Sequence, residues 1–305
     1  MEKLPADTKA YFIKLGHEGE WEEPCLTSGT IRFAYRKISH EPCLHGQWDE
    51  VQALCAKMRG KGTGKNDARQ VQTYYEADAS SIFITFYKGE LWWCHPTGVP
   101  EVLPEERNAR VRQTVSGWRK TSVGGRPLLI SELSGKLTKT QMYRGTICEV
   151  SETPYLLRRI NDEQTPELAA AQETENRLLV QMLAMIRLLD PLDFELMVEL
   201  VFSQSGWRRQ TRTGGTQKTV DVDLQLPSTG ERAFVQVKSE TDTRTFDDYA
   251  QRFEAQDAHA RMFFVWHTGV ITRDPPPNIT MWGPDVIASK VLEAGLLAWL
   301  KDRVS

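Results

Sequence analysis

Five polar residues between positions 195 and 238 have the chemistry needed to bind a divalent cation and to move a proton. They are Glu195, Asp221, Asp223, Gln236 and Lys238. Carboxylate and amide oxygens are the ligands that hard cations such as Mg²⁺ prefer. A lysine amine can take part in acid–base chemistry or stabilise a developing negative charge. Whether these groups act together depends on the elements that carry them.

Two runs of alternating apolar and polar residues carry four of the five. Thr219–Leu226 and Arg232–Lys238 show the period of two that is typical of half-buried strands. Between them lies Pro227–Gly230, which predicts a turn because proline fixes φ and glycine permits a positive φ. The two runs therefore predict an antiparallel hairpin. Its core-facing residues are expected to be Val220, Val222, Leu224, Leu226, Val235 and Val237.

The other face of the hairpin gathers the polar groups, because residues two apart on a strand share a face. These groups are Asp221, Asp223, Gln236 and Lys238. We expect Leu226 to lie opposite Ala233. In that register Asp223 faces Gln236, and Asp221 faces Lys238.

A helical pattern precedes the hairpin and carries Glu195. Asp190 followed by Pro191 is typical of a helix N-cap and first turn. Glu195 and Glu199 are four residues apart and therefore share one face of the helix. A carboxylate on this helix is able to point at the hairpin.

This stretch resembles the Mrr-type branch of the PD-(D/E)XK nuclease superfamily over about residues 188–305. The matching residues are Phe194-Glu195, Gly206-Trp207, Gly214-Gly215, Val222-Asp223-Leu224 and Val235-Gln236-Val237-Lys238. The last of these is the Gln-x-Lys variant of the family's final motif. The spacing of 13 between Asp223 and Gln236 favours Asp223 over Asp221 as the family's main metal-binding aspartate.

The resemblance implies a magnesium-dependent deoxyribonuclease with a restriction-endonuclease-like α/β sandwich. Asp223, Glu195 and Gln236 would bind Mg²⁺, for which Mn²⁺ can substitute. Lys238 would orient or deprotonate the attacking water, and Asp221 would be a partner of Lys238. Double-stranded DNA is the implied substrate, and cutting both strands implies a homodimer. From residue 188 onward the patterns follow the order helix, hairpin, strand, helix, strand, strand and helix. They include a near-continuous apolar run at Arg261–Trp266, expected to be a buried parallel strand, and an amphipathic helix over Pro284–Arg303. This order independently predicts an α/β layer sandwich.

The first half of the chain predicts a small β-barrel decorated by helices. Its expected strands are Tyr11–Leu15, Thr30–Tyr35, Ser81–Tyr87, Leu91–Cys94, Ala109–Val115 and Ile147–Val150, and Gln47–Met58 is expected to be a helix. Residues 8–155 resemble the PUA superfamily, nearest to EVE-like domains. The matching pieces are Tyr11–Leu15, Gly29-Thr30-Ile31-Arg32, Leu91-Trp92-Trp93, Gly117-Trp118 and Arg144-Gly145-Thr146.

The EVE-like resemblance implies an aromatic pocket for a modified nucleobase. The candidate wall residues are Trp21, Tyr35, Trp92, Trp93 and Trp118, of which Trp92 and Trp93 point to opposite faces of one strand. A base reader joined to a nuclease resembles a modification-dependent, type IV-like restriction enzyme used in phage defence. Two alternatives stay open. The first half could sense a small ligand that activates the nuclease, or the nuclease-like half could be a non-catalytic scaffold of a nucleic-acid-binding protein.

Three segments are predicted to lack regular structure. Gly16–Gly29 is expected to be a loop. Arg59–Asn66 fails the phosphate-loop pattern, because Arg59 and Asn66 replace the required glycine and hydroxyl residues, and is expected to be a flexible basic loop. Glu152–Thr165 is expected to be a linker, followed by a connecting helix over Glu167–Leu189. The predicted domains are therefore 8–155 and 188–305, joined by residues 156–187.

Composition adds weaker expectations. The 305 residues carry a net charge of −3, which does not by itself indicate a polyanionic partner. The five cysteines, all in the first half, form no C-x-x-C pair, and no secretory signal or apolar run of membrane-spanning length stands out. We therefore expect a cytoplasmic chain with reduced thiols and no membrane partner.

Overall fold

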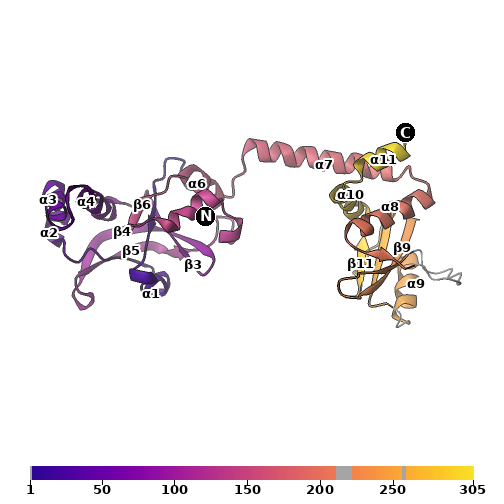
Figure 1. Ribbon diagram of the computed structural model, residues 1–305, viewed down its shortest axis with the longest axis horizontal. Coiled ribbons are helices and arrows are strands. Elements are labelled where there is room, and N and C mark those ends of the chain that lie inside the picture. The colour runs from indigo at the N-terminus through magenta and orange to yellow at the C-terminus, as the bar shows by residue number, and fades with distance from the viewer. Residues whose placement is uncertain (1, 211–221, 256–258) are drawn as a thin grey trace. The chain divides into compact units, whose positions relative to one another are not determined.

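The computed structural model describes residues 2–210, 222–255 and 259–305, which divide into two compact units (Figure 1). The first unit is Met1–Gln164 and the second is Thr165–Ser305. The boundary lies nine residues beyond the end of the first predicted domain at residue 155. Each unit is described separately below.

The first unit is built on a six-stranded sheet with the order β2-β5-β4-β3-β1-β6. The strands are β1 (Ala10–Ile13), β2 (Thr30–Phe33), β3 (Ile82–Tyr87), β4 (Glu90–Leu103), β5 (Ala109–Arg119) and β6 (Ile147–Glu149). Strand β1 pairs in parallel with β3, and the other pairings are antiparallel. All six predicted strands are confirmed, with shifted ends.

The predicted closed barrel is not present in this unit. Within residues 2–164, which are all described, β2 and β6 lie at opposite ends of the strand order and do not pair. A barrel requires its two edge strands to hydrogen-bond to each other. The sheet of the first unit is therefore open, and the barrel prediction is not confirmed, because strand alternation does not specify which edges meet.

Six α-helices accompany this sheet: α1 (Glu22–Ser28), α2 (His40–Leu44), α3 (Trp48–Arg59), α4 (Lys61–Glu76), α5 (Gly135–Thr138) and α6 (Thr153–Ile160). Short 3₁₀ turns occupy His17–Gly19, Pro104–Glu106, Ile130–Glu132 and Lys139–Met142. Two of these helices correct the predicted loops. Helix α1 occupies most of the second half of Gly16–Gly29. Helix α6 lies in the predicted linker and buries Leu156, Leu157 and Ile160 in the core.

The predicted basic loop Arg59–Asn66 is also helical, apart from one residue. Gly60 has a φ of +82° and separates the end of α3 from the start of α4. Gly64 lies inside α4, where a Cβ atom would come within 2.5 Å of the backbone of Cys55 and Ala56 in α3. The glycines thus permit a sharp helix–helix turn and a close backbone approach, and neither requirement can be distinguished from a flexible loop by composition.

The sheet of the first unit has apolar residues on both faces. One cluster contains Ile31, Phe33, Tyr74, Phe83 and Trp118, and the other contains Phe12, Ile84, Trp93, Leu137 and Ile160. Trp93 is 1% exposed in the second cluster, whereas Trp92 is half-buried against the first. The prediction that these neighbours point to opposite faces is confirmed.

The second unit is a five-stranded sheet with the order β11-β10-β9-β8-β7. Its strands are β7 (Arg208–Arg209), β8 (Val222–Gln225), β9 (Arg232–Glu240), β10 (Arg261–Thr268) and β11 (Ile279–Trp282). Strands β9, β10 and β11 run parallel, and β8 pairs antiparallel with β7 and β9. The predicted hairpin and the buried parallel strand at Arg261–Trp266 are confirmed.

The described residues of this unit form five α-helices: α7 (Pro166–Ile186), α8 (Pro191–Gln204), α9 (Thr243–Glu254), α10 (Pro284–Glu293) and α11 (Leu297–Arg303). Helix α8 begins as predicted, with the Asp190 carboxylate accepting a hydrogen bond from the Leu192 N–H. The single helix predicted over Pro284–Arg303 is two helices, because Gly295 between them has a φ of +71°. No helix in the described part of the chain is both long enough and apolar enough to cross a membrane.

The two faces of this sheet are covered by different helices, which gives the predicted sandwich (Figure 1). Val222, Leu224, Val235 and Val237 pack on one face against residues of α7, α8, α10 and α11. Phe234, Met262 and Phe264 pack on the other face against α9 through Phe246, Ala250 and Phe253. Because β9 alternates, Gln236 and Lys238 lie on the α9 face with Phe234.

Candidate active site

The β8–β9 hairpin places Asp223 two residues away from its predicted register. Asp223 lies opposite Phe234, and Leu224 lies opposite Ala233. The hairpin closes on a tight turn in which the Leu226 N–H donates to the Glu231 carbonyl. The predicted register needed a longer loop than Pro227–Gly230 provides. The shift is even-numbered, so the paired residues of β8 and β9 keep their predicted faces.

Both oxygens of the Asp223 carboxylate have a partner from within the second unit. Arg232 Nη2 donates to Oδ2 at 2.8 Å, and His259 Nε2 lies 3.1 Å from Oδ1. The Asp223 side chain is 13% exposed and the His259 side chain 4%. A carboxylate with two such contacts is firmly positioned. A carboxylate oxygen has more than one lone pair, so each oxygen can still accept a further interaction.

Gln236 and Lys238 lie next to each other on the α9 face of β9. Gln236 is 1% exposed, and Lys238 is half-buried. The Lys238 Nζ atom lies 5.2 Å from the centre of the Tyr249 ring of α9. A cation–π contact of this kind holds the ammonium group in place without neutralising its charge. Lys238 therefore has a defined position beside a buried amide.

Glu195 comes from the layer on the other side of the sheet. It is half-buried on α8, whose neighbouring residues Phe194 and Met197 pack against the opposite sheet face. Its helix neighbour Glu199 forms an ion pair with Arg209 at 2.7 Å. Of the two glutamates predicted to share a helix face, Glu199 therefore has a structural partner in Arg209.

The predicted metal ligands carry oxygen donors of the type that Mg²⁺ requires. In donor chemistry, these residues therefore fit that ion. Within residues 2–210, 222–255 and 259–305, no three His, Cys, Asp or Glu side chains come together as a metal-binding group. Asp221, the fifth predicted residue, lies outside the described residues. The donor chemistry of the site therefore suits magnesium, while the principal carboxylate ligand stays a prediction.

Three residues of this region were not identified from the sequence: Arg232, Tyr249 and His259. Arg232 was counted only as the start of a strand, although its position two residues before Phe234 places it on the same face as Asp223. Tyr249 lies 11 residues beyond Lys238, and His259 lies 36 residues beyond Asp223. Long-range packing brings them together, and no local spacing indicates it.

The predicted base-binding aromatics have different environments in the first unit. Trp21, Trp93 and Trp118 are buried, and the Nε1–H groups of Trp93 and Trp118 donate to the carbonyls of Thr121 and Thr30. Trp92 is half-buried, with Lys120 Nζ 5.6 Å from its ring centre. Tyr35 borders a cavity of about 470 Å³.

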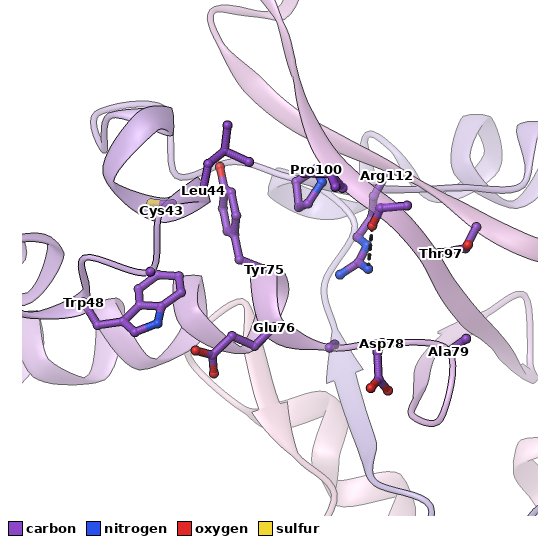
Figure 2. Close-up of a pocket in the computed structure, with 14 residues that line it drawn as sticks. Cys43, Leu44, Trp48, Tyr75, Glu76, Asp78, Ala79, Thr97, Pro100 and Arg112 are labelled. Carbon is purple, nitrogen blue, oxygen red and sulfur yellow. Dashed lines mark hydrogen bonds between the residues drawn. The ribbon is translucent and has the colours of Figure 1, made fainter.

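A second cavity of about 420 Å³ lies near Trp48, Tyr75 and Arg112 (Figure 2). Arg112 is buried, and it donates to the Tyr74 carbonyl at 2.6 Å and to the Gly98 carbonyl at 3.1 Å. Tyr74 is in the last turn of α4, where the helix dipole favours a positive charge. Arg112 thus has a structural role at the end of α4.

Residues 186–274 match the family model of a restriction endonuclease catalytic domain, Mrr_cat. This range contains all five predicted catalytic residues, and the α/β sandwich of the second unit agrees with it. Among solved structures, the MspJI restriction endonuclease in complex with a 27-mer oligonucleotide is similar at 10% identity. That match covers 80% of this chain and 68% of the other, with a TM-score of 0.27, which is too low to bear on the fold. No curated protein matches the chain significantly.

Proposed function

We propose that this chain, which carries a Mrr-type restriction endonuclease domain over residues 186–274, is a magnesium-dependent endonuclease that hydrolyses phosphodiester bonds of foreign DNA containing modified bases. The observation that carries the proposal is the α9 face of the hairpin. There Asp223, Gln236 and Lys238 lie on one side of two paired strands inside the matched domain. Carboxylate, amide and ammonium are the groups that such hydrolysis requires.

In this proposal Gln236 and an aspartate of the Asp221–Asp223 pair bind the metal on the α9 face, and Glu195, which lies in the layer on the other face of the sheet, is the least well placed of the predicted ligands. When bound, Mg²⁺ lowers the pKa of a coordinated water and neutralises charge on the phosphate. The Lys238 ammonium, held beside Tyr249, orients the attacking water and stabilises negative charge that develops on the phosphate oxygens. Arg232 and His259 orient the Asp223 carboxylate. Water adds to phosphorus as the bond to the leaving oxygen breaks.

The Lys238→Ala variant tests the nuclease assignment. Loss of the ammonium group is expected to lower the cleavage rate by about 100-fold or more, because charge stabilisation at the reacting phosphate is lost. DNA binding, measured in EDTA, is expected to change little. Lys290→Ala is a matched control, since Lys290 is a partly exposed lysine paired with Glu293 on α10. Full cleavage by Lys238→Ala would contradict the mechanism.

The first unit is proposed to recognise the modified base. Its support is the cavity beside Tyr35, whose volume of about 470 Å³ is in the usual range for small-ligand sites. A base that enters such a site leaves the DNA stack and is held by stacking and by polar contacts to its edge. Equal cleavage rates on modified and unmodified DNA would contradict this part of the proposal.

Cleavage of both strands is proposed to require a homodimer, because each chain has one such site. The rate of linearising a plasmid would then depend on protein concentration more steeply than the rate of nicking. Two results together would show that no dimer is required. Light scattering would find a monomer, and the rates of linearising and of nicking the plasmid would depend on protein concentration in the same way.

A further inference from the structure

The cavity beside Tyr35 lies at the end of a stack of three aromatic rings. The Tyr35 and Phe33 ring centres are 4.7 Å apart with an interplanar angle of 22°. Phe33 stacks in turn on Tyr74, at 4.6 Å and 15°. Phe33 and Tyr74 are buried, whereas Tyr35 borders the cavity. A planar ring that entered the cavity would therefore meet an aromatic wall that cannot move away.

A buried carboxylate forms the polar part of the same cavity. Asp67 of α4 borders it, and the Asp67 side chain is 8% exposed. Tyr35 Oη donates to Asp67 Oδ1 at 2.9 Å, and Arg59 Nη1 lies 3.4 Å from Oδ2. Burial and the nearby Asp67 raise the pKa of Tyr35 far above its usual range, so the phenol keeps its proton and stays a donor. Each Asp67 oxygen has a lone pair left for another donor.

The remaining lining consists of apolar residues, basic residues and Thr146. Ile38 and Cys55 are buried, and Met58 is 40% exposed. Three cations also line the cavity: Arg36, Lys37 and Arg59. Lys37 and Arg59 are exposed to solvent, so they are available to an anion outside the cavity. The cavity thus offers a ring surface, a hydrogen-bond acceptor and a positively charged surround.

We propose that this cavity binds a nucleobase with an exocyclic amino group, of the cytosine or adenine type. The ring stacks on Tyr35, the amino group donates to Asp67, and the phosphate contacts the cations outside. Cytosine N4 and adenine N6 are amino donors, whereas thymine and guanine present a carbonyl oxygen at the corresponding position (O4 and O6), which a carboxylate repels. This inference deepens the proposed function and rests on it, because it names the base class that the first unit recognises.

The base has two possible sources, a nucleotide flipped out of DNA or a free nucleotide. Both present the same ring and amino group. We therefore measure binding of the full chain in EDTA to two sets of probes. One set is dCMP, 5-methyl-dCMP, dAMP, N6-methyl-dAMP and dTMP. The other is a series of duplexes that carry a single 5-methylcytosine or N6-methyladenine beside 2-aminopurine, whose fluorescence rises when the neighbouring base leaves the stack.

Two variants test the cavity. Asp67→Asn keeps the size of the side chain but removes the anionic acceptor, and is expected to weaken binding of the amino-bearing probes about tenfold. Met58→Trp fills the cavity from a partly exposed position, and is expected to abolish binding while the melting temperature is kept. The matched control is the double variant Tyr87→Phe, Glu23→Gln. It removes another Tyr–carboxylate hydrogen bond, from Tyr87 Oη to Glu23 Oε2 at 3.1 Å, between residues that do not line this cavity. The control is expected to bind like the wild type.

Binding of free nucleotides alone assigns the cavity to a soluble ligand, and a 2-aminopurine signal assigns it to a flipped base. Either result supports the proposed site if Asp67→Asn and Met58→Trp weaken the nucleotide binding or the 2-aminopurine signal. The proposal is overturned if no probe binds, if dTMP binds as well as dCMP and dAMP, or if both variants bind like the wild type. The Mg²⁺-dependent cleavage lost in Lys238→Ala is measured separately, so failure of the cavity proposal leaves the nuclease assignment standing.

Discussion

At the scale of single residues, Asp223 combines a predicted metal-binding role with two contacts to basic side chains. Sequence spacing favoured it as the main metal ligand, but Arg232 and His259 contact both of its oxygens. A guanidinium beside a carboxylate partly neutralises the charge that would attract a divalent cation. We therefore propose that Asp223 has a positioning role and that Asp221 is the principal carboxylate ligand.

The variants Asp221→Asn and Asp223→Asn distinguish a metal-binding role from a positioning role. Asp223→Asn is expected to lower the free energy of unfolding by about 1–2 kcal/mol, because Arg232 and His259 lose their anionic partner. We expect Asp221→Asn to abolish Mg²⁺-dependent cleavage, and Asp223→Asn to keep part of it. Urea denaturation and a cleavage assay over a range of Mg²⁺ concentrations measure both effects. If Asp223→Asn alone abolishes cleavage, Asp223 is the ligand after all.

His267 makes the stability of the second unit depend on pH. It is buried edge-on against Phe194, at a centroid distance of 4.6 Å. Burial, with Arg187 nearby, lowers the pKa of His267 below its ordinary value. The unfolded chain protonates this histidine near pH 6.5, while the folded chain resists protonation. Protons thus bind preferentially to the unfolded state, and stability falls as the pH drops below about 6.5.

The urea midpoint is therefore expected to decrease between pH 7.5 and pH 5.5, and less so for His267→Gln. His40 in the first unit has a pKa lowered by burial as well. The comparison of the wild type with His267→Gln removes that common contribution. An identical pH dependence for the two proteins would show that His267 does not contribute.

At the scale of elements, the α3–α4 pair depends on one glycine. A Cβ atom at Gly64 would lie 2.5 Å from the Ala56 nitrogen and the Cys55 carbonyl carbon. The Gly64→Ala variant is expected to destabilise the first unit by about 1–3 kcal/mol, because the helices must separate. Gly62 is on the same helix, and nothing lies within 4 Å of the Cβ that would be added there. Gly62→Ala is expected to stabilise the helix by about 0.5–1 kcal/mol.

Thermal unfolding followed by circular dichroism measures both variants. Opposite shifts in melting temperature are the expected result. Equal shifts of the same sign would mean that Gly64 has no special packing role, and that the glycines serve only the loop that composition suggested.

The elements that periodicity determines were predictable, and those set by glycine geometry or long-range pairing were not. The near-continuous apolar run at Arg261–Trp266 indicated the buried parallel strand β10, and the Asp190-Pro191 pair indicated the start of α8. Gly60 and Gly64 suggested a loop because glycine is common in loops and also at close helix contacts. The open edge of the first sheet depends on which strands meet, and alternation contains no such information.

In the candidate site, too, features set by periodicity were predictable and features set by long-range packing were not. The face shared by Asp223, Gln236 and Lys238 was predictable, because a period of two survives an even-numbered register shift. The contacts of His259 and Tyr249 were not, because they come from segments beyond the hairpin. The contact of Arg232 lies within the hairpin and follows from the observed register. Of the five aromatic candidates, composition could not tell that Trp93 and Trp118 donate to backbone carbonyls inside the core.

At the scale of the whole molecule, the chain combines two units that each have their own sheet and apolar core. The endonuclease family match lies entirely within the second unit, and the Tyr35 cavity lies in the first. In the proposed function, recognition and cleavage are therefore carried by different units. Cavity variants are expected to change which DNA is cut, and Lys238 variants to change whether any DNA is cut.

The most direct test is cleavage of phage genomic DNAs with and without modified bases, in Mg²⁺, by the wild type and by Lys238→Ala. The account predicts that the wild type cuts only the modified DNA, and that Lys238→Ala cuts neither. Equal cutting of both DNAs would contradict the base-reading role of the first unit. The absence of cutting by the wild type, with DNA binding retained, would contradict the nuclease assignment itself.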